Sequence, residues 1–203
     1  DPLLWFSGVE NVLLWAMDDP EFLSDYAALV ARWNRDNLVL MAEAGVEYVV
    51  RRGWYETADF WSPELFDRFL LPHLRAETAF ARSAGILYAY CMNSGVNPLL
   101  DALARSGIHV LCNLDDRAPR TTPALLRQRL GGRVALCGGV NNQHVLARGS
   151  RDDVRRAVHR AMDEFAGPRA FILAPGDSLL EPTAKTEENF HALVAAWREC
   201  AGA

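Results

Sequence analysis

The sequence has little lysine and no excess of positive charge. Its 203 residues carry 21 basic and 26 acidic side chains, a net charge of −5, and Lys185 is the only lysine. Proteins that bind nucleic acid concentrate positive charge on one surface, so this balance argues against a nucleic-acid partner. A Schiff-base mechanism would have to use Lys185.

Several other signals are missing. No apolar run reaches the ~18–20 residues that span a bilayer, and no basic-then-apolar leader precedes the first helix, so we expect no membrane association. The four cysteines, at positions 91, 112, 137 and 200, are scattered and form no C-x-x-C pair, which predicts a reducing, cytoplasmic compartment. H-x-x-x-H and H-E-x-x-H motifs, which would indicate a histidine-built metal site, do not occur. Neither do G-x-G-x-x-G or P-loop motifs, which would favour a nucleotide-binding sheet.

What the sequence does contain is an alternation of strand and helix patterns. Half of the residues are hydrophobic, enough for one substantial core. Five short, nearly continuous apolar runs predict buried strands, at 46–50, 86–91, 109–114, 134–140 and 170–176. Longer segments between and around them have apolar residues at helical spacing, including Phe22 to Met41, Val154 to Phe165 and Phe190 to Trp197.

Helix starts are marked by a capping side chain followed by proline. A capping oxygen accepts a bond from a free backbone N–H of the first turn, and proline at the first helical position has no N–H to leave unpaired. This pattern predicts helices starting at Asp19-Pro20, Ser62-Pro63, Asn97-Pro98 and Thr122-Pro123. We also expect Ser150 and Thr186 to cap the last two long helices.

The alternation indicates right-handed βα units around a parallel sheet. A closed (β/α)8 TIM barrel has eight strands and typically ~250 residues. Five strands in a chain that begins at Asp1 without a methionine therefore predict an incomplete barrel of about five βα units, whose first strands are missing. We expect residues 1–203 to form a single domain of this kind.

Functional residues of such folds gather in the loops after the carboxyl ends of the strands. That rule selects Arg51, Arg52, Trp54, Tyr55 and Glu56 after the first strand, Cys91, Asn93 and Ser94 after the second, Asn113, Asp115 and Asp116 after the third, Gly138, Gly139, Asn141 and Asn142 after the fourth, and Asp177 and Ser178 after the fifth.

Within this set Asp177, Glu56 and Cys91 are the candidate catalytic residues. Apolar neighbours of the two carboxyls would raise their pKa values for acid–base work, but Asp177 equally suits a turn cap and Glu56 an ion pair with Arg51 or Arg52. Cys91 is either a ligand or reactive thiol, or a small buried side chain, as cysteines usually are. A zinc cluster of Cys91, Cys112 and Cys137 is the weaker alternative.

The remaining candidates are substrate-binding residues: Trp54, Tyr55, Asn93, Asn113, Asp115, Gly138, Gly139 and Asn141. The two glycines let backbone N–H groups approach an anion closely, or simply permit a tight turn.

Five segments, in this order, resemble the carboxyl-terminal part of the uroporphyrinogen decarboxylase superfamily. They are "DNLVLMAEAGVEYVV", "SPELFDRFLLPHL", "NPLLDALARSGIHVL", "LGGRVALCGGVNNQHVLARGSRDDVRRAV" and "AFILAPGDSLLEPTAKTEENFHALVAAW". The superfamily also includes cobalamin-dependent methyltransferases. The resemblance implies a (β/α)8 barrel with a central pocket at its carboxyl-terminal mouth, and it implies a homodimer, since family members are often dimers.

The chain departs from both activities of the superfamily. The methyltransferases hold zinc with a His-x-Cys pair and a later Pro-Gly-Cys loop, where this sequence has Ala89-Tyr90-Cys91 and Pro175-Gly176-Asp177. The decarboxylases have a Gly-His-Gly loop where this sequence has Gly176-Asp177-Ser178, and their arginine-rich motif lies upstream of Asp1. We therefore expect no bound metal, with Cys91 and Asp177 as the alternative ligands.

Together these features predict a cofactor-independent, carboxy-lyase-type enzyme acting on a carboxylated or tetrapyrrole-like small molecule. One alternative is a corrinoid-dependent methyltransferase that uses Cys91 with or without zinc and works with a corrinoid protein as partner. Another is a non-catalytic ligand-binding subunit on the same scaffold.

Overall fold

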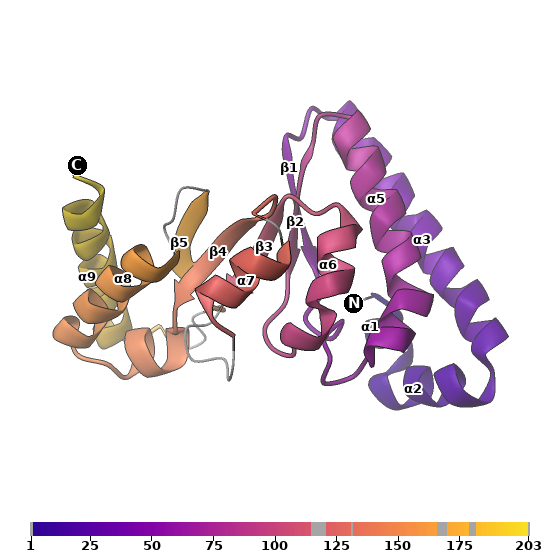
Figure 1. The fold of residues 1–203 in the computed structure, drawn as a ribbon, viewed down its shortest axis with the longest axis horizontal. Coiled ribbons are helices and arrows are strands. Elements are labelled where there is room, and N and C mark those ends of the chain that lie inside the picture. Colours follow the sequence, from indigo (N-terminus) through magenta and orange to yellow (C-terminus); the bar gives the residue numbers. More distant parts are fainter. Residues whose placement is uncertain (1, 115–120, 131, 166–169, 179–181, 203) are drawn as a thin grey trace. The chain divides into compact units, whose positions relative to one another are not determined.

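The computed structural model describes residues 2–114, 121–130, 132–165, 170–178 and 182–202. Their strands are β1 (Tyr48–Arg52), β2 (Leu87–Cys91), β3 (Val110–Leu114), β4 (Ala135–Val140) and β5 (Phe171–Pro175), in a sheet whose order follows the chain (Figure 1). The registers of β1 with β2 and of β4 with β5 are parallel. All five strands predicted from the sequence are present, and five parallel strands are those of a partial barrel.

Helices precede, separate and follow the strands. They are α1 (Pro2–Ser7), α2 (Val9–Asp18), α3 (Pro20–Glu43), α4 (Pro63–Leu65), α5 (Leu71–Ser83), α6 (Leu100–Ser106), α7 (Pro123–Leu130), α8 (Arg151–Phe165) and α9 (Ala184–Ala201). Two π-helical turns, η1 (Phe66–Leu70) and η3 (Asn142–Ala147), and one 3₁₀ turn, η2 (Asn97–Leu99), complete the described elements. None of the described helices combines the length and apolarity that crossing a bilayer requires.

The chain divides into two compact units. Unit 1 comprises Asp1–Val110 and Arg129–Val134, and unit 2 comprises Leu111–Gln128 and Ala135–Ala203. In unit 1, α5 packs on β2 and α3, and the core contains Trp61, Phe66 and Phe69. In unit 2, α8 packs on β4, β5 and α9. Each unit is described by itself, and the single domain expected from the sequence stays a prediction.

Most of the predicted caps are confirmed. The side chains of Asp19, Ser62 and Thr122 accept bonds from backbone N–H groups three residues later, at 3.0, 3.2 and 3.2 Å. Ser150 caps α8 in the same way. Two caps were wrong. Thr183, not Thr186, caps α9, because its hydroxyl accepts the Thr186 N–H at 3.2 Å. At Asn97 the chain makes a tight 3₁₀ turn that begins from the Val96 carbonyl and has no side-chain cap.

The apolar stripe predicted on α3 is mostly not in the core. The helix buries Leu23, Ala27, Val30 and Leu38. Of the predicted stripe, Phe22, Leu29, Trp33, Leu40 and Met41 remain exposed. Helical spacing alone therefore located the helix but not its buried face.

Candidate functional site: a cavity above a buried ion network

The first strand brings an arginine into the interior of unit 1. Arg51 lies in β1, and its guanidinium donates from Nη1 to Glu77 Oε1 at 2.5 Å and from Nη2 to Glu56 Oε1 at 2.7 Å. The side chains of Glu56 and Glu77 are only 3% and 4% exposed, and that of Arg51 is 13% exposed. Buried charges persist only when they are paired and hydrogen-bonded, so we treat these three side chains as one ion network.

Two tyrosines of β2 complete the network. Tyr88 and Tyr90 flank Ala89 in β2, and their hydroxyls donate to Glu77 of α5 and to Glu56 of the segment after β1. Asn34 of α3 also donates to Glu77, at 3.1 Å. Both tyrosines are essentially fully buried, and a buried tyrosine hydroxyl needs such an acceptor.

The charges within the network fix its protonation. Burial by itself would raise the pKa of Glu56, but the adjacent Arg51 guanidinium lowers it, and the pKa lies well below its ordinary value. The expectation that apolar surroundings raise this pKa was therefore wrong, because the attraction of the Arg51 guanidinium contributes to a net lowering despite burial. Burial would lower the pKa of Arg51, and Glu56 and Glu77 together raise it well above its ordinary value. Burial raises the pKa values of both tyrosines, which remain neutral donors.

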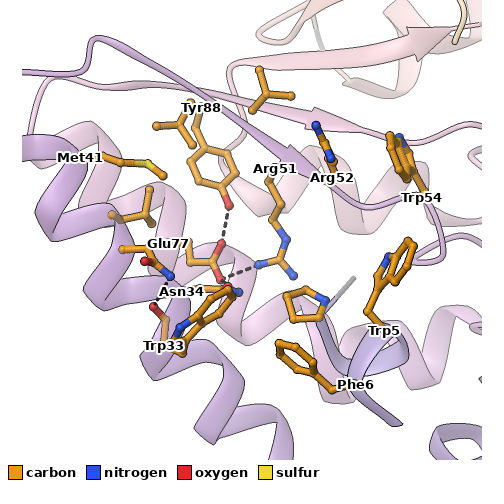
Figure 2. A pocket seen from close by; sticks show the side chains of 15 residues that line it. Trp5, Phe6, Trp33, Asn34, Met41, Arg51, Arg52, Trp54, Glu77 and Tyr88 are labelled. Atoms are coloured by element: carbon orange, nitrogen blue, oxygen red, sulfur yellow. Dashed lines mark hydrogen bonds and ion pairs between the residues drawn. The ribbon is translucent and has the colours of Figure 1, made fainter. Parts of the chain in front are cut away.

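A cavity of about 630 Å³ lies over this network, within unit 1. Figure 2 shows Arg51, Glu77 and Tyr88 directed toward one another, with Trp5 and Phe6 contributed by α1. Its wall is mainly aromatic and apolar, and its size is that of a small-molecule site. The lining residues are Pro2, Trp5, Phe6, Trp33, Asn34, Asn37, Leu38, Met41, Val49, Val50, Arg51, Arg52, Trp54, Glu77 and Tyr88.

Two features make the cavity suited to an anionic, ring-bearing ligand. The guanidinium of Arg52 lies 5.1 Å from the centre of the Trp54 ring. This arrangement presents a cation beside an aromatic face at the carboxyl end of β1. Among the described residues, no acceptor lies within hydrogen-bond distance of the buried Nε of Arg51. A buried N–H without an acceptor is costly, so a ligand oxygen there would be stabilising.

Of the residues of unit 1 that the sequence selected, Arg51, Arg52 and Trp54 line the cavity, whereas Tyr55, Glu56, Cys91 and Asn93 do not. Glu56 forms its ion pair with Arg51 in the buried network. The Tyr55 ring packs 6.4 Å from that of Trp5. Cys91 ends β2 opposite Arg52, is 8% exposed, and its carbonyl accepts the Gly53 N–H at 2.9 Å. Asn93 follows in the next loop, half-buried.

In unit 2 the predicted residues occupy the ends of β3, β4 and β5. Gly138 and Gly139 lie within β4 at φ 140° and 96°. A Cβ on Gly138 would lie 2.3 Å from the Leu114 carbonyl oxygen, so close strand approach already requires glycine there. Asn113 has φ 64°. Asp115 lies outside the described residues.

The polar candidates of unit 2 have local structural roles. Asn141 caps η3, accepting the His144 N–H at 2.6 Å. Asp177 accepts the Ser178 N–H at 2.6 Å, in the turn after Gly176. A catalytic role of Asp177 stays a prediction.

The zinc site considered from the sequence would have Ala89 and Asp177 at two of its ligand positions, and whether the chain binds a metal stays a prediction. No group of three or more His, Cys, Asp or Glu side chains that would hold a metal occurs in the described part of the chain. Ala89, in place of the histidine ligand, is fully buried. Cys137 instead hydrogen-bonds to Cys112, which together with burial raises its pKa. All four cysteines are free thiols.

Sequence reasoning missed Glu77, Tyr88 and Asn34. In the sequence, Glu77 has the pattern of a solvent-exposed helix position. Its partners Arg51 and Asn34 are 26 and 43 residues away. A signal was nevertheless present, since two tyrosines two positions apart in a buried strand both require hydroxyl partners.

A comparison with solved structures aligns the chain with a methyltransferase from Methanosarcina mazei. The TM-score is 0.79 at 23% identity, over 94% of this chain and 53% of that one. This chain therefore spans about half the length of the structure it matches, and at this identity the likeness shows the fold. A comparison with curated proteins gives no match. The family model described as uroporphyrinogen decarboxylase (URO-D) matches residues 6–200, so the chain belongs to the uroporphyrinogen decarboxylase family.

Proposed function

We propose that this protein is a carboxy-lyase-type enzyme that acts, without a cofactor, on a carboxylated or tetrapyrrole-like small molecule. The observation that carries the proposal is Arg52 stacked beside Trp54 in the unit 1 cavity. A guanidinium binds a carboxylate through two parallel hydrogen bonds, while the aromatic wall accepts a flat ring.

Glu56 and Glu77 both pair with Arg51, the neighbour of Arg52 in β1, so the ion network orients one of the side chains that line this cavity. Glu56 is an orienting group in this proposal, because it is ionised and engaged. From their positions after the strands, we also propose an acid–base role for Asp177 and substrate binding by Asn93, Gly138, Gly139 and Asn141.

Binding of uroporphyrin, a flat polycarboxylate, tests the cavity through the fluorescence of its tryptophans. Arg52→Ala is expected to weaken binding about tenfold or more, because a hydrogen bond to a charged group is worth ~1.5–3 kcal/mol. Arg68→Ala is the matched control, since Arg68 also lies over a ring, 4.9 Å from Phe69, but does not line the cavity. Equal affinity of Arg52→Ala and wild type would overturn the assignment.

A methyltransferase is the second candidate, because Cys91 is a buried thiol at the carboxyl end of β2. Under this alternative, Cys91→Ser abolishes methyl transfer to free cobalamin. Under our proposal it leaves CO₂ release within a few-fold of wild type, whereas Asp177→Asn lowers turnover with unchanged uroporphyrin affinity. Uroporphyrin binding with neither CO₂ release nor methyl transfer would indicate a non-catalytic ligand-binding subunit.

A further inference from the structure

A thiol, an imidazole and a carboxylate meet on α8 and α9 in unit 2. His159 belongs to α8, and Glu199 and Cys200 are consecutive residues near the end of α9. The two helices pack against each other, so side chains 40 and 41 residues apart in the sequence come into contact. None of the three lines the unit 1 cavity, and the proposed function uses none of them.

The three side chains form a chain of hydrogen bonds. The Sγ atom of Cys200 lies 3.5 Å from Nδ1 of His159, and Nε2 of the same ring lies 3.4 Å from Oε2 of Glu199. A carboxylate is a hydrogen-bond acceptor, so this contact favours the neutral tautomer with its proton on Nε2. Nδ1 is then the acceptor for the Cys200 S–H, which is the arrangement in which a base takes the proton of a nucleophile.

Glu199 makes a second contact with α8, through Arg155, one turn before His159. Arg155 Nε and Nη2 each lie 3.0 Å from Oε2 of Glu199, the oxygen that also faces His159. Arg155 and Glu199 both line a cavity of about 600 Å³ over α8 and α9. A small molecule therefore has room next to the carboxylate that contacts the imidazole.

The cysteines differ in their access to solvent. Cys91 and Cys112 are only 8% and 6% exposed, whereas Cys200 is half-buried beside an imidazole whose side chain is 43% exposed. Cys137 is half-buried as well, but its hydrogen bond is to the thiol of Cys112, which together with burial raises its pKa. Cys200 therefore combines access to solvent with a neighbouring base.

We propose that Cys200 is a modification site whose thiol exchanges with a low-mass disulfide, with His159 as its base. Sγ bonds to one sulfur of the reagent as the S–S bond of the reagent breaks, and the other sulfur leaves as a thiolate. The proton passes from Cys200 to Nδ1 of His159 and then to that thiolate. The products are a mixed disulfide on Cys200 and one free thiol, so the exchange needs no other oxidant.

Oxidised glutathione is the probe, and mass spectrometry of peptides from the folded, full-length chain identifies and times the modified cysteine. Cys200 is expected to react at least about tenfold faster than Cys137, because proton transfer to a positioned base contributes ~10²–10⁴ to such reactions. For the same reason, H159Q is expected to lower the rate at Cys200 about tenfold or more.

H191Q is the matched control. His191 lines the same cavity as Glu199 but lies about 13 Å before Cys200 along the axis of α9, so H191Q should react at Cys200 as wild type does. In concentrated urea, wild type and H159Q should react at Cys200 at the same rate, because the two helices no longer pack. Equal rates at Cys200 and Cys137 in the folded wild type, or equal rates in H159Q and H191Q, would overturn the proposal. A difference between wild type and H159Q that persists in urea would also overturn it.

Discussion

Replacing Arg51 by methionine tests whether one guanidinium keeps two carboxylates ionised inside unit 1. Arg51 contacts Glu77 at 2.5 Å and Glu56 at 2.7 Å, and both carboxylates are at least 96% buried. Removing one partner of a buried pair leaves an uncompensated charge and typically costs ~3–5 kcal/mol. We expect a loss of unfolding free energy of this size at pH 7, measured by urea denaturation.

The exposed pair of Arg105 and Asp67 provides the matched control. Their side chains are 53% and 43% exposed, at an N–O distance of 2.7 Å. Exposed pairs contribute less than ~1 kcal/mol, so Arg105→Met should be close to wild type. The triple variant R51M/E56Q/E77Q should recover part of the stability that Arg51→Met loses, because its buried amides carry no charge.

The difference in unfolding free energy between wild type and Arg51→Met should depend on pH in a defined direction. The pKa of Glu56 is lowered in the folded protein. Its stabilising contribution is therefore present above the unfolded value of ~4.3 and is lost as the pH falls through the folded value. Without Arg51, burial raises the same pKa above ~4.3, so protonation recovers stability as the pH falls from 7 toward 5. The gap between wild type and Arg51→Met should shrink over that range. A gap that stays constant, or an Arg51→Met variant as stable as Arg105→Met, would refute this reasoning.

Gly138→Ala and Asn189→Ala test the backbone contacts of unit 2, and Gly85→Ala in unit 1 is the control for the first. Gly138→Ala should lower the unfolding free energy by about 3 kcal/mol or more, since its Cβ would meet the Leu114 carbonyl oxygen at 2.3 Å. Gly85→Ala, at φ 74° in open space, should cost only ~1–2 kcal/mol, and equal losses would contradict the steric argument. Asn189→Ala should cost ~1–3 kcal/mol, because its amide donates at 2.9 Å to two backbone carbonyls. A change below ~0.5 kcal/mol in urea denaturation would contradict this role.

The sequence predicted where the strands lie better than it predicted the side-chain contacts that they make. The first strand was expected at 46–50 and lies at Tyr48–Arg52, where it pairs with β2 up to Arg52 opposite Cys91. Glu56 was expected as either an acid–base group or a partner of Arg51 or Arg52, and the structure pairs it with Arg51. Arg51, the cation that lowers the pKa of Glu56, is only five residues away, so this ion pair could be predicted from the sequence.

Other features depend on contacts distant in the sequence. Glu77 joins the network through Tyr88 and Asn34, residues of a strand and a helix that only the fold brings together. The choice between Thr183 and Thr186 as the cap of α9 is likewise invisible in the sequence, where both are threonines near the helix start.

The most direct test of the proposed function is CO₂ release from reduced uroporphyrin, compared between wild type, Arg52→Ala and Arg68→Ala. We predict release above the uncatalysed rate by wild type and Arg68→Ala, with at least a tenfold lower rate for Arg52→Ala at subsaturating substrate. No release by wild type, together with Cys91-dependent methyl transfer to cobalamin, would contradict the proposal.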